Sequence, residues 1–369
     1  MPLINKITKL LKTPKIFVFT IIWMMILVTI GTLAQKDMGL FAAQEKYFSS
    51  WIFWAWYFPF PGGRPTMIIM LINLSFFLFN KNLWKISKSG ILIIHLGGFL
   101  LLFGGGLTAI FSSEGNIVIE EGKTSNFIED YHYMELAIVK VSDKDFDTFT
   151  IFDHPLLKRK QILTHENFNF EIKIINFLKN CEPIRRSGPA EVYYRGMMKN
   201  FMLSELAPLK EENMNRPGIM FHIENSGTNA DGVYGLFWGQ SIPQKIQINN
   251  EEYMFVLRKK RTYLPFAIEL LDFKKVMHPG TGIAKSYSSS VNLIEDGIAK
   301  RILIKMNTPL RHNSYTFYQS SFIEGPEGDT TVLAVVKNYG RLFPYISSII
   351  MCIGLLIHLS MRLPALFRK

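Results

Sequence analysis

One histidine lies inside the most apolar stretch of the chain. His95 is the only ionisable side chain between Gly90 and Phe111, in GILIIHLGGFLLLFGGGLTAIF, and this stretch is long enough to cross a bilayer as one helix. An imidazole inside a membrane span is costly and therefore points to a function. Histidine is a common ligand of metals and of haem iron. The alternative is a glycine-rich seam for helix packing with one histidine bonded to a neighbour, and the stretch alone leaves both open.

Four apolar stretches predict four membrane-spanning helices, at residues 16–33, 65–80, 90–111 and 343–360. The first could instead be a signal peptide. Against this, its apolar run is longer than a usual signal core, and the residues after it form only a weak cleavage site. The second stretch is short and contains Asn73.

Basic residues flank these stretches and predict their orientation. The N-terminus (1–15), the loop 81–89 and the tail 361–369 carry lysine or arginine, and the positive-inside rule places them in the cytoplasm. Four spans then put the loop 34–64 and the segment 112–342 outside, on the outer face of a bacterial cytoplasmic (inner) membrane. Because much of the net charge of +11 flanks the spans, we do not attribute it to nucleic-acid binding.

The segment 112–342 is predicted to be a β-rich domain. Alternating or β-branched runs recur there between turn residues, for example NIVIE (116–120), MELAIVKV (134–141) and FEIKIINF (170–177). This spacing is typical of a sandwich or a barrel-like domain. The expected fold class is therefore a membrane protein with four transmembrane helices and a large extracytoplasmic β-rich domain between helices three and four.

Two polar residues in other spans could assist His95. At about 1.5 Å per residue, Asn73, His95 and His358 lie roughly 12, 10 and 6 Å from the nearest cytoplasmic basic residue. Asn73 could therefore bond the second ring nitrogen of His95 and hold its tautomer. His358 could be a second axial ligand, although a histidine near the end of a span more often lies simply at the interface.

The loop 34–64 has an aromatic centre. Tyr47, Trp51, Trp54 and Phe58 recur at helical spacing, which predicts a short helix along the membrane surface. Tryptophan and tyrosine concentrate at this interface, so anchoring is the simpler interpretation. The alternative is that Trp51 and Trp54 contact the edge of a bound porphyrin.

The predicted outer domain shows no catalytic pattern. Its histidines have no metal-site spacing such as HxH or HExxH, and we interpret them as surface or structural residues. No Ser/His/Asp arrangement, phosphate loop or pair of carboxylates stands out. We therefore assign no catalytic residue.

Three strings of the sequence, together with His95, carry a family resemblance. They are SKSGILIIHLGGFLLLFGGGLTAIFSSEGNIVIEEGKT, Pro265-Phe266 followed by Pro279-Gly280-Thr281-Gly282, and YTFYQSS at 315–321. Each string is weak alone, but in combination the resemblance covers nearly the whole chain. It is weakest over residues 178–245. On this basis the chain resembles the ResB (CcsB) family of cytochrome c biogenesis proteins of System II.

This resemblance implies a haem-handling membrane subunit. ResB-like proteins pair with a CcsA/ResC-type membrane protein, carry haem b across the membrane without attaching it covalently, and present it to apocytochrome c for thioether formation. His95 resembles one axial ligand of the haem iron, and the other ligands and a tryptophan-rich motif belong to the partner. The tryptophans at 51–56 lack the pattern of that motif. The alternative function is a non-catalytic, membrane-anchored scaffold that docks apocytochrome and binds no haem itself.

Overall fold

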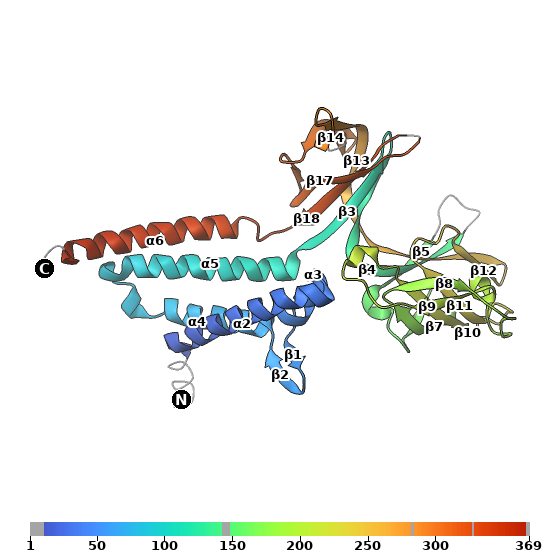
Figure 1. Cartoon of the computed structure of the whole chain (residues 1–369), viewed down its shortest axis with the longest axis horizontal. Helices are drawn as coiled ribbons and strands as arrows, with labels where there is room; N and C mark the ends of the chain where they lie inside the picture. The colour runs from blue at the N-terminus through green and yellow to red at the C-terminus, as the bar shows by residue number, and fades with distance from the viewer. Residues whose placement is uncertain (1–10, 142–147, 282–283, 327, 367–369) are drawn as a thin grey trace. The chain divides into compact units, whose positions relative to one another are not determined.

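The computed structural model describes residues 11–141, 148–281, 284–326 and 328–366, which divide into two compact units. A helical unit contains the chain up to residue 113 and from residue 337 onward, and a β unit contains most of the residues between (Figure 1). The basic residues expected at 1–10 and 367–369 and part of the 279–282 turn lie outside the described residues.

Apolar helices make up the helical unit: α2 (Pro14–Met38), α4 (Gly63–Leu78), α5 (Ser89–Phe111) and α6 (Phe343–Leu366). Pro14 begins α2 in the first turn, where its missing N–H costs no hydrogen bond. Gly39 follows the end of α2 with a φ of 85°, which favours glycine. Short helical segments connect these helices: α3 (Leu40–Ala43), η1 (Gln44–Phe48), η2 (Lys81–Leu83) and η3 (Ile86–Lys88).

Three of the four predicted spans are helices that are long and apolar enough to cross a membrane: Pro14–Met38, Ile86–Phe111 and Phe343–Leu363. The helix at the remaining one, α4, has 16 residues. At about 1.5 Å per residue it is roughly 24 Å long, whereas the hydrocarbon core of a bilayer is about 30 Å thick. A fourth span therefore stays a prediction.

The aromatic loop forms a hairpin where a surface helix was expected. Helical structure ends at Phe48, and β1 (Ile52–Ala55) then pairs antiparallel with β2 (Phe58–Pro61). The prediction of a helix from Tyr47 to Phe58 is therefore wrong. Prolines at 59 and 61 have no N–H for a helix interior but are tolerated in a two-stranded hairpin. Phe53 is buried against Tyr47 and Leu27, which fastens the hairpin to α2.

The β unit is built around one large sheet. Its strands follow the order β15-β14-β13-β4-β3-β18-β17-β16, with β12 also paired to β13 and β5 to β4. They are β3 (Ser113–Glu120), β4 (Thr124–Val141), β5 (Thr148–Asp153), β12 (Gln244–Ile248), β13 (Glu251–Met277), β14 (Ala284–Glu295), β15 (Ile298–Lys305), β16 (Leu310–His312), β17 (Tyr315–Ile323) and β18 (Thr330–Lys337). The sheet curls so that strands far apart in this order face each other. The buried Ser289 of β14 bonds Gln319 of β17 and Thr331 of β18, neither of which is a neighbour of β14 in the sheet.

A smaller sheet covers one part of the large one. It has the order β11-β10-β7-β6, with β6 (Ile162–His165), β7 (Phe168–Leu178), β10 (Gly218–Glu224) and β11 (Gly232–Phe237). A separate pair, β8 (Cys181–Arg185) and β9 (Phe201–Glu205), adjoins it in sequence. In β7 the alternation of FNFEIKII buries Phe168, Phe170, Ile172 and Ile174, which pack in one core with residues of β4 and β13. The predicted β-rich domain is thus confirmed, as a two-sheet sandwich continued by a curled sheet.

The longest strand, β13, changes the face that it buries. Odd-numbered residues are buried from Tyr253 to Leu257, and even-numbered residues are buried from Leu264 to Leu270. The register with β4 shifts between these two parts, at Lys259/Arg261 and again at Tyr263/Ile268. Such a bulge is needed because side chains alternate with a period of two, so one strand can serve two cores only if its phase changes.

His154 should make the stability of the β unit depend on pH. Its Nδ1 accepts the backbone N–H of Met134 at 3.3 Å, and its ring lies edge-on to Phe177 with centroids 4.9 Å apart. Burial lowers the pKa of His154 and Lys179 lowers it further, whereas Asp130 raises it. Since the folded pKa lies below the unfolded value, the stabilisation is present above about pH 6.5 and is lost as the pH falls toward the folded pKa.

We expect the melting temperature of the full chain in detergent to fall from about pH 7.5 to about pH 5.5. The fall should be smaller in His154→Gln, whose carboxamide oxygen can accept the same N–H at either pH. Equal falls in the two proteins would assign the pH dependence to other groups.

Candidate functional site

His95 lies on the side of α5 that packs against α4. Its ring centroid is 4.5 Å from that of Phe77, and its side chain is half-buried. Its Nδ1 lies 2.7 Å from the backbone carbonyl oxygen of Ile91, one turn earlier. A carbonyl oxygen only accepts hydrogen bonds, so neutral His95 carries its proton on Nδ1. The Nε2 lone pair, to which no group among the described residues is hydrogen-bonded, is then available to a metal ion, as in sites where a carbonyl orients a ligating imidazole.

A different face of α5 is a glycine seam against α6. Gly90, Gly97 and Gly104 recur every seven residues and are buried. A methyl group at Gly90 would lie 2.6 Å from the backbone nitrogen of His358, so the two antiparallel helices approach to backbone contact (Figure 1). At about 100° per residue, His95 is turned roughly 140–180° away from this seam.

Other glycines keep the His95 side of α5 open. Gly98, Gly105 and Gly106 lie within roughly 80° of His95 around the helix, at about 100° per residue. A methyl group at Gly105 or Gly106 would meet no atom within 4 Å, and one at Gly98 would meet Leu74 of α4 at 3.7 Å. A flat ligand or another helix can therefore approach the backbone of α5 at Gly105 and Gly106, which lie roughly 15 Å along the helix from His95 at about 1.5 Å per residue.

Asn73 has other partners than the one expected. Its buried side-chain amide donates to the backbone carbonyl oxygens of Leu11 and of Thr13, the latter at 3.1 Å, and so fastens α4 to the beginning of α2. The group that holds the tautomer of His95 is the carbonyl of Ile91. The expected bond between Asn73 and His95 is thus wrong, because equal depth in a membrane does not determine which neighbour a side chain meets.

His358 lies on the seam, where its backbone contacts Gly90. Since His95 faces away from the seam, the two histidines lie on different sides of α5. The structure does not bring them together as an axial pair. The helical rise per residue predicts how deep His95 and His358 lie in the membrane. It does not predict the direction of His95 around the axis of α5, which depends on the face of α5 that packs against α6.

The two tryptophans considered as porphyrin contacts are exposed on the hairpin. The exposed fraction is 59% for Trp51 and 61% for Trp54. The opposite side of the hairpin is held to α2, where Trp23 stacks on Phe60 and donates from Nε1 to the carbonyl oxygen of Pro61 at 3.0 Å. The exposed tryptophans are available to lipid or to a ligand, and their role stays a prediction.

The histidines of the β unit have individual partners. His132 pairs with Glu212, His222 with Glu224 and His312 with Glu295. Within the described residues, no group of three or more His, Cys, Asp or Glu side chains could hold a metal ion.

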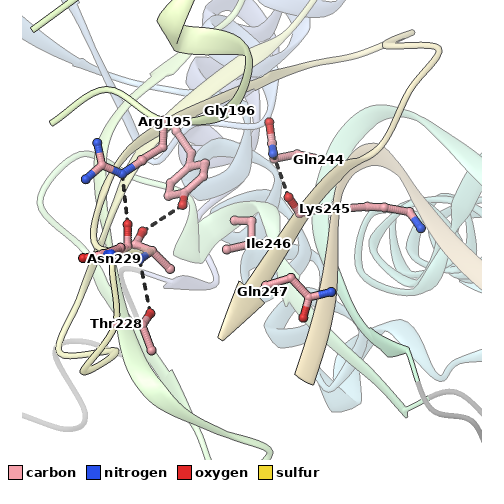
Figure 2. A pocket seen from close by; sticks show the side chains of 10 residues that line it. Arg195, Gly196, Thr228, Asn229, Gln244, Lys245, Ile246 and Gln247 are labelled. Atoms are coloured by element: carbon pink, nitrogen blue, oxygen red, sulfur yellow. Dashed lines mark hydrogen bonds between the residues drawn. The ribbon is translucent and has the colours of Figure 1, made fainter. Parts of the chain in front are cut away.

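A cleft of about 430 Å³ opens beside β12 (Figure 2). Arg195 donates from Nε to the carbonyl oxygen of Asn229 at 3.1 Å, and the Tyr234 hydroxyl donates to a backbone carbonyl at 2.8 Å. The Gln244 amide donates to the carbonyl oxygen of Lys245 at 3.0 Å. These polar groups are already hydrogen-bonded to the protein itself, so we interpret them as stabilising the local structure and not as ligand contacts.

The sequence interpretation missed a buried ion pair in the β unit. Arg258 donates from Nε to Glu135 at 2.7 Å, and their side chains are 14% and 2% exposed. Glu135 also accepts the backbone N–H of Arg261 at 3.2 Å. The available signal was the basic run RKKR at 258–261, which the structure places within β13, since charged residues on the buried face of a strand require acidic partners.

Three apolar helices in one unit and a second, large β-rich unit indicate a membrane protein with a large β-rich domain. Residues 241–332 match the family described as the ResB-like family. The chain is also 21% identical over 335 residues to Protein NrfI of Wolinella succinogenes, an alignment covering 89% of this chain and 32% of that protein. The chain thus spans about a third of the length of this curated relative. Both findings confirm the predicted resemblance to the ResB-like family.

Proposed function

We propose that the chain is the ResB-like subunit of a System II cytochrome c synthase. Together with a CcsA/ResC-type membrane protein it carries haem b across the bacterial cytoplasmic membrane and presents it to apocytochrome c for thioether attachment. The match of residues 241–332 to the ResB-like family supports a role in cytochrome c biogenesis. Haem is the cargo of this process and is bound without a covalent link.

In this proposal four helices, α2, α4, α5 and α6, cross the membrane. Both termini are cytoplasmic, and the β unit lies on the outer side. The lysines at 81, 85 and 88, between α4 and α5, support this orientation because basic loops stay in the cytoplasm. A short span such as α4 is accommodated by local thinning of the bilayer.

The observation that carries the proposal is the hydrogen bond of His95. The carbonyl of Ile91 keeps the proton on Nδ1 and fixes the orientation of the ring, so Nε2 can donate its lone pair to the haem iron. Gly105 and Gly106 leave open space on the same side of α5, roughly 15 Å farther along the helix at about 1.5 Å per residue. Because His358 lies on the seam, the second axial ligand comes from the partner protein.

The test is an optical spectrum of the reduced complex. The full chain is purified with its CcsA/ResC-type partner as wild type, His95→Ala and His358→Ala. Wild type and His358→Ala should show the spectrum of haem with two histidine ligands. His95→Ala should lose it, because one axial ligand is gone, and added imidazole should restore it.

Equal haem in wild type and His95→Ala would place the haem site wholly in the partner. The same holds if cytochrome c is matured while no haem copurifies. Either result would leave the scaffold function, in which the chain docks apocytochrome and binds no haem.

A further inference from the structure

The β1–β2 hairpin packs against the apolar middle of α2 and projects away from the long helices (Figure 1). Trp23 of α2 donates from Nε1 to the carbonyl oxygen of Pro61 at 3.0 Å, and Phe53 is buried beside Leu27. At about 1.5 Å per residue, Trp23 and Leu27 lie roughly 10 and 17 Å from the start of the apolar stretch 16–33. In the proposed function, on which this inference rests, α2 crosses the membrane, so the hairpin lies at the depth of the lipid chains.

One edge of this hairpin has free backbone groups. Pro59 and Pro61 have no N–H, so the ladder holds them where the backbone groups of β2 point outward. Their partners in the register, Trp54 and Ile52, then point their own N–H and C=O groups outward from β1. Among the described residues, no hydrogen bond reaches these four groups. Lipid chains cannot supply one, and non-helical backbone at this depth is found only where protein or enclosed water covers it.

The tip of the hairpin holds an aromatic residue in a conformation that favours glycine. Trp56 and Tyr57 form the two-residue loop between β1 and β2, and their exposed fractions are 94% and 90%. The φ of Trp56 is 57°, a left-handed value that glycine adopts freely and that a bulky side chain rarely adopts. Backbone strain of this kind is found mainly at sites of function. A fully exposed tryptophan in this position therefore indicates a contact outside the chain.

A cation beside the hairpin has no anionic partner among the described residues. Arg64 is exposed in the first turn of α4, where the helix dipole disfavours a positive charge. A methyl group at Gly63 would lie 2.5 Å from the carbonyl oxygen of Phe48, and one at Gly31 would lie 2.7 Å from the ring of Phe48. The backbone of Arg64 is therefore near the level of Gly31, within the apolar stretch of α2. A cation at this depth is costly unless it is paired, so Arg64 indicates a missing anion.

We propose that the hairpin is a docking surface for a transmembrane helix of the partner membrane protein. An Asp or Glu side chain of that helix pairs with Arg64, its other polar side chains bond the free edge of β1, and its apolar side chains pack on Trp54 and Trp56. A lipid phosphate could pair with Arg64, but it has no donor for the free carbonyl groups of β1. The charge and the free edge together favour a protein over lipid. In the proposed function this protein is the CcsA/ResC-type partner.

The first experiment measures how much co-expressed CcsA/ResC-type partner copurifies with the tagged full chain in mild detergent. Trp56→Gly removes the exposed side chain and leaves a residue that adopts a φ of 57° freely, so the fold should be kept. The copurified partner should fall at least about fivefold, because tryptophans contribute strongly to interfaces. Arg64→Gln should lower it as well, and Arg64→Lys should retain more of it because the charge is kept. Phe79→Ala removes an 80% exposed aromatic side chain at the other end of α4 and should copurify like wild type.

Photo-crosslinking identifies what covers the hairpin. Benzoylphenylalanine in place of Trp54 should crosslink to a transmembrane segment of the partner in native membranes, and mass spectrometry of the product locates that segment. The control is the same group in place of Met25, which is 64% exposed between Trp23 and Leu27 along α2. At about 100° per residue, Met25 is turned roughly 160° away from both, so it should give little crosslink to the partner.

Crosslinks from position 54 to lipid alone, or to a second copy of the chain alone, would overturn the inference. Unchanged copurification of the partner with Trp56→Gly would overturn it as well. The readout is the partner protein and not haem. A chain that holds the partner but no haem would therefore contradict only the haem proposal, whereas a normal haem spectrum with full partner binding in Trp56→Gly would contradict only the docking.

Discussion

Replacing Glu135 by leucine should destabilise the β unit by about 3–5 kcal/mol, the usual cost of leaving one buried charge unpaired. The side chain of Glu135 is 2% exposed and accepts both Nε of Arg258 and the backbone N–H of Arg261. Without it, the guanidinium group of Arg258 would remain in the interior with no anion. Chemical denaturation of the full chain in detergent, followed by circular dichroism of the strands, measures this loss.

The control is an exposed ion pair of β13, the strand that carries Arg258. Asp272 and Lys274 are paired at 3.2 Å, and their side chains are 45% and 70% exposed, so Asp272→Asn should cost at most about 1 kcal/mol. The double variant Glu135→Leu with Arg258→Met should recover much of the stability, because both buried charges are removed together. A small loss in the single Glu135 variant would mean that water reaches Arg258 and that this pair behaves like a surface one.

Replacing Gly90 by alanine should separate α5 from α6. The new methyl group would lie 2.6–2.7 Å from the backbone nitrogen, Cα and Cβ of His358, and backbone atoms cannot move aside as the end of a flexible side chain can. Overpacking of this kind costs about 1–3 kcal/mol. Unfolding of the helices in a titration with a denaturing detergent, followed by circular dichroism, should begin earlier than in wild type.

Gly105→Ala is the control on the same helix, because its methyl group would meet nothing within 4 Å. It should leave this transition unchanged or slightly later, since alanine favours a helix more than glycine does. Equal behaviour of Gly90→Ala and Gly105→Ala would mean that α5 and α6 do not depend on close contact at the seam.

The membrane helices and the strands were predictable because their signals are local. The apolar stretch at 90–111 corresponds to α5 (Ser89–Phe111), and the alternation in FEIKIINF lies within β7 (Phe168–Leu178). The hairpin shows the limit of such signals. The aromatic residues from Tyr47 to Phe58 fit a helical period, but the prolines that follow and the packing of Phe53 on α2 favour a hairpin.

The candidate site, too, has features that the local sequence predicts and features that depend on tertiary packing. The sequence by itself determined that His95 lies within an apolar helix, that a β-rich domain follows, and that the chain resembles the ResB family, because hydropathy, alternation and short strings belong to neighbouring residues. Only the tertiary structure decided that Asn73 bonds the beginning of α2 and that His358 lies on the glycine seam. It also decided the pairing of Arg258 with Glu135, 123 residues apart in the chain. The physical reason is that depth and period follow from the chain alone, whereas the partner of a polar side chain depends on which faces of distant elements pack together.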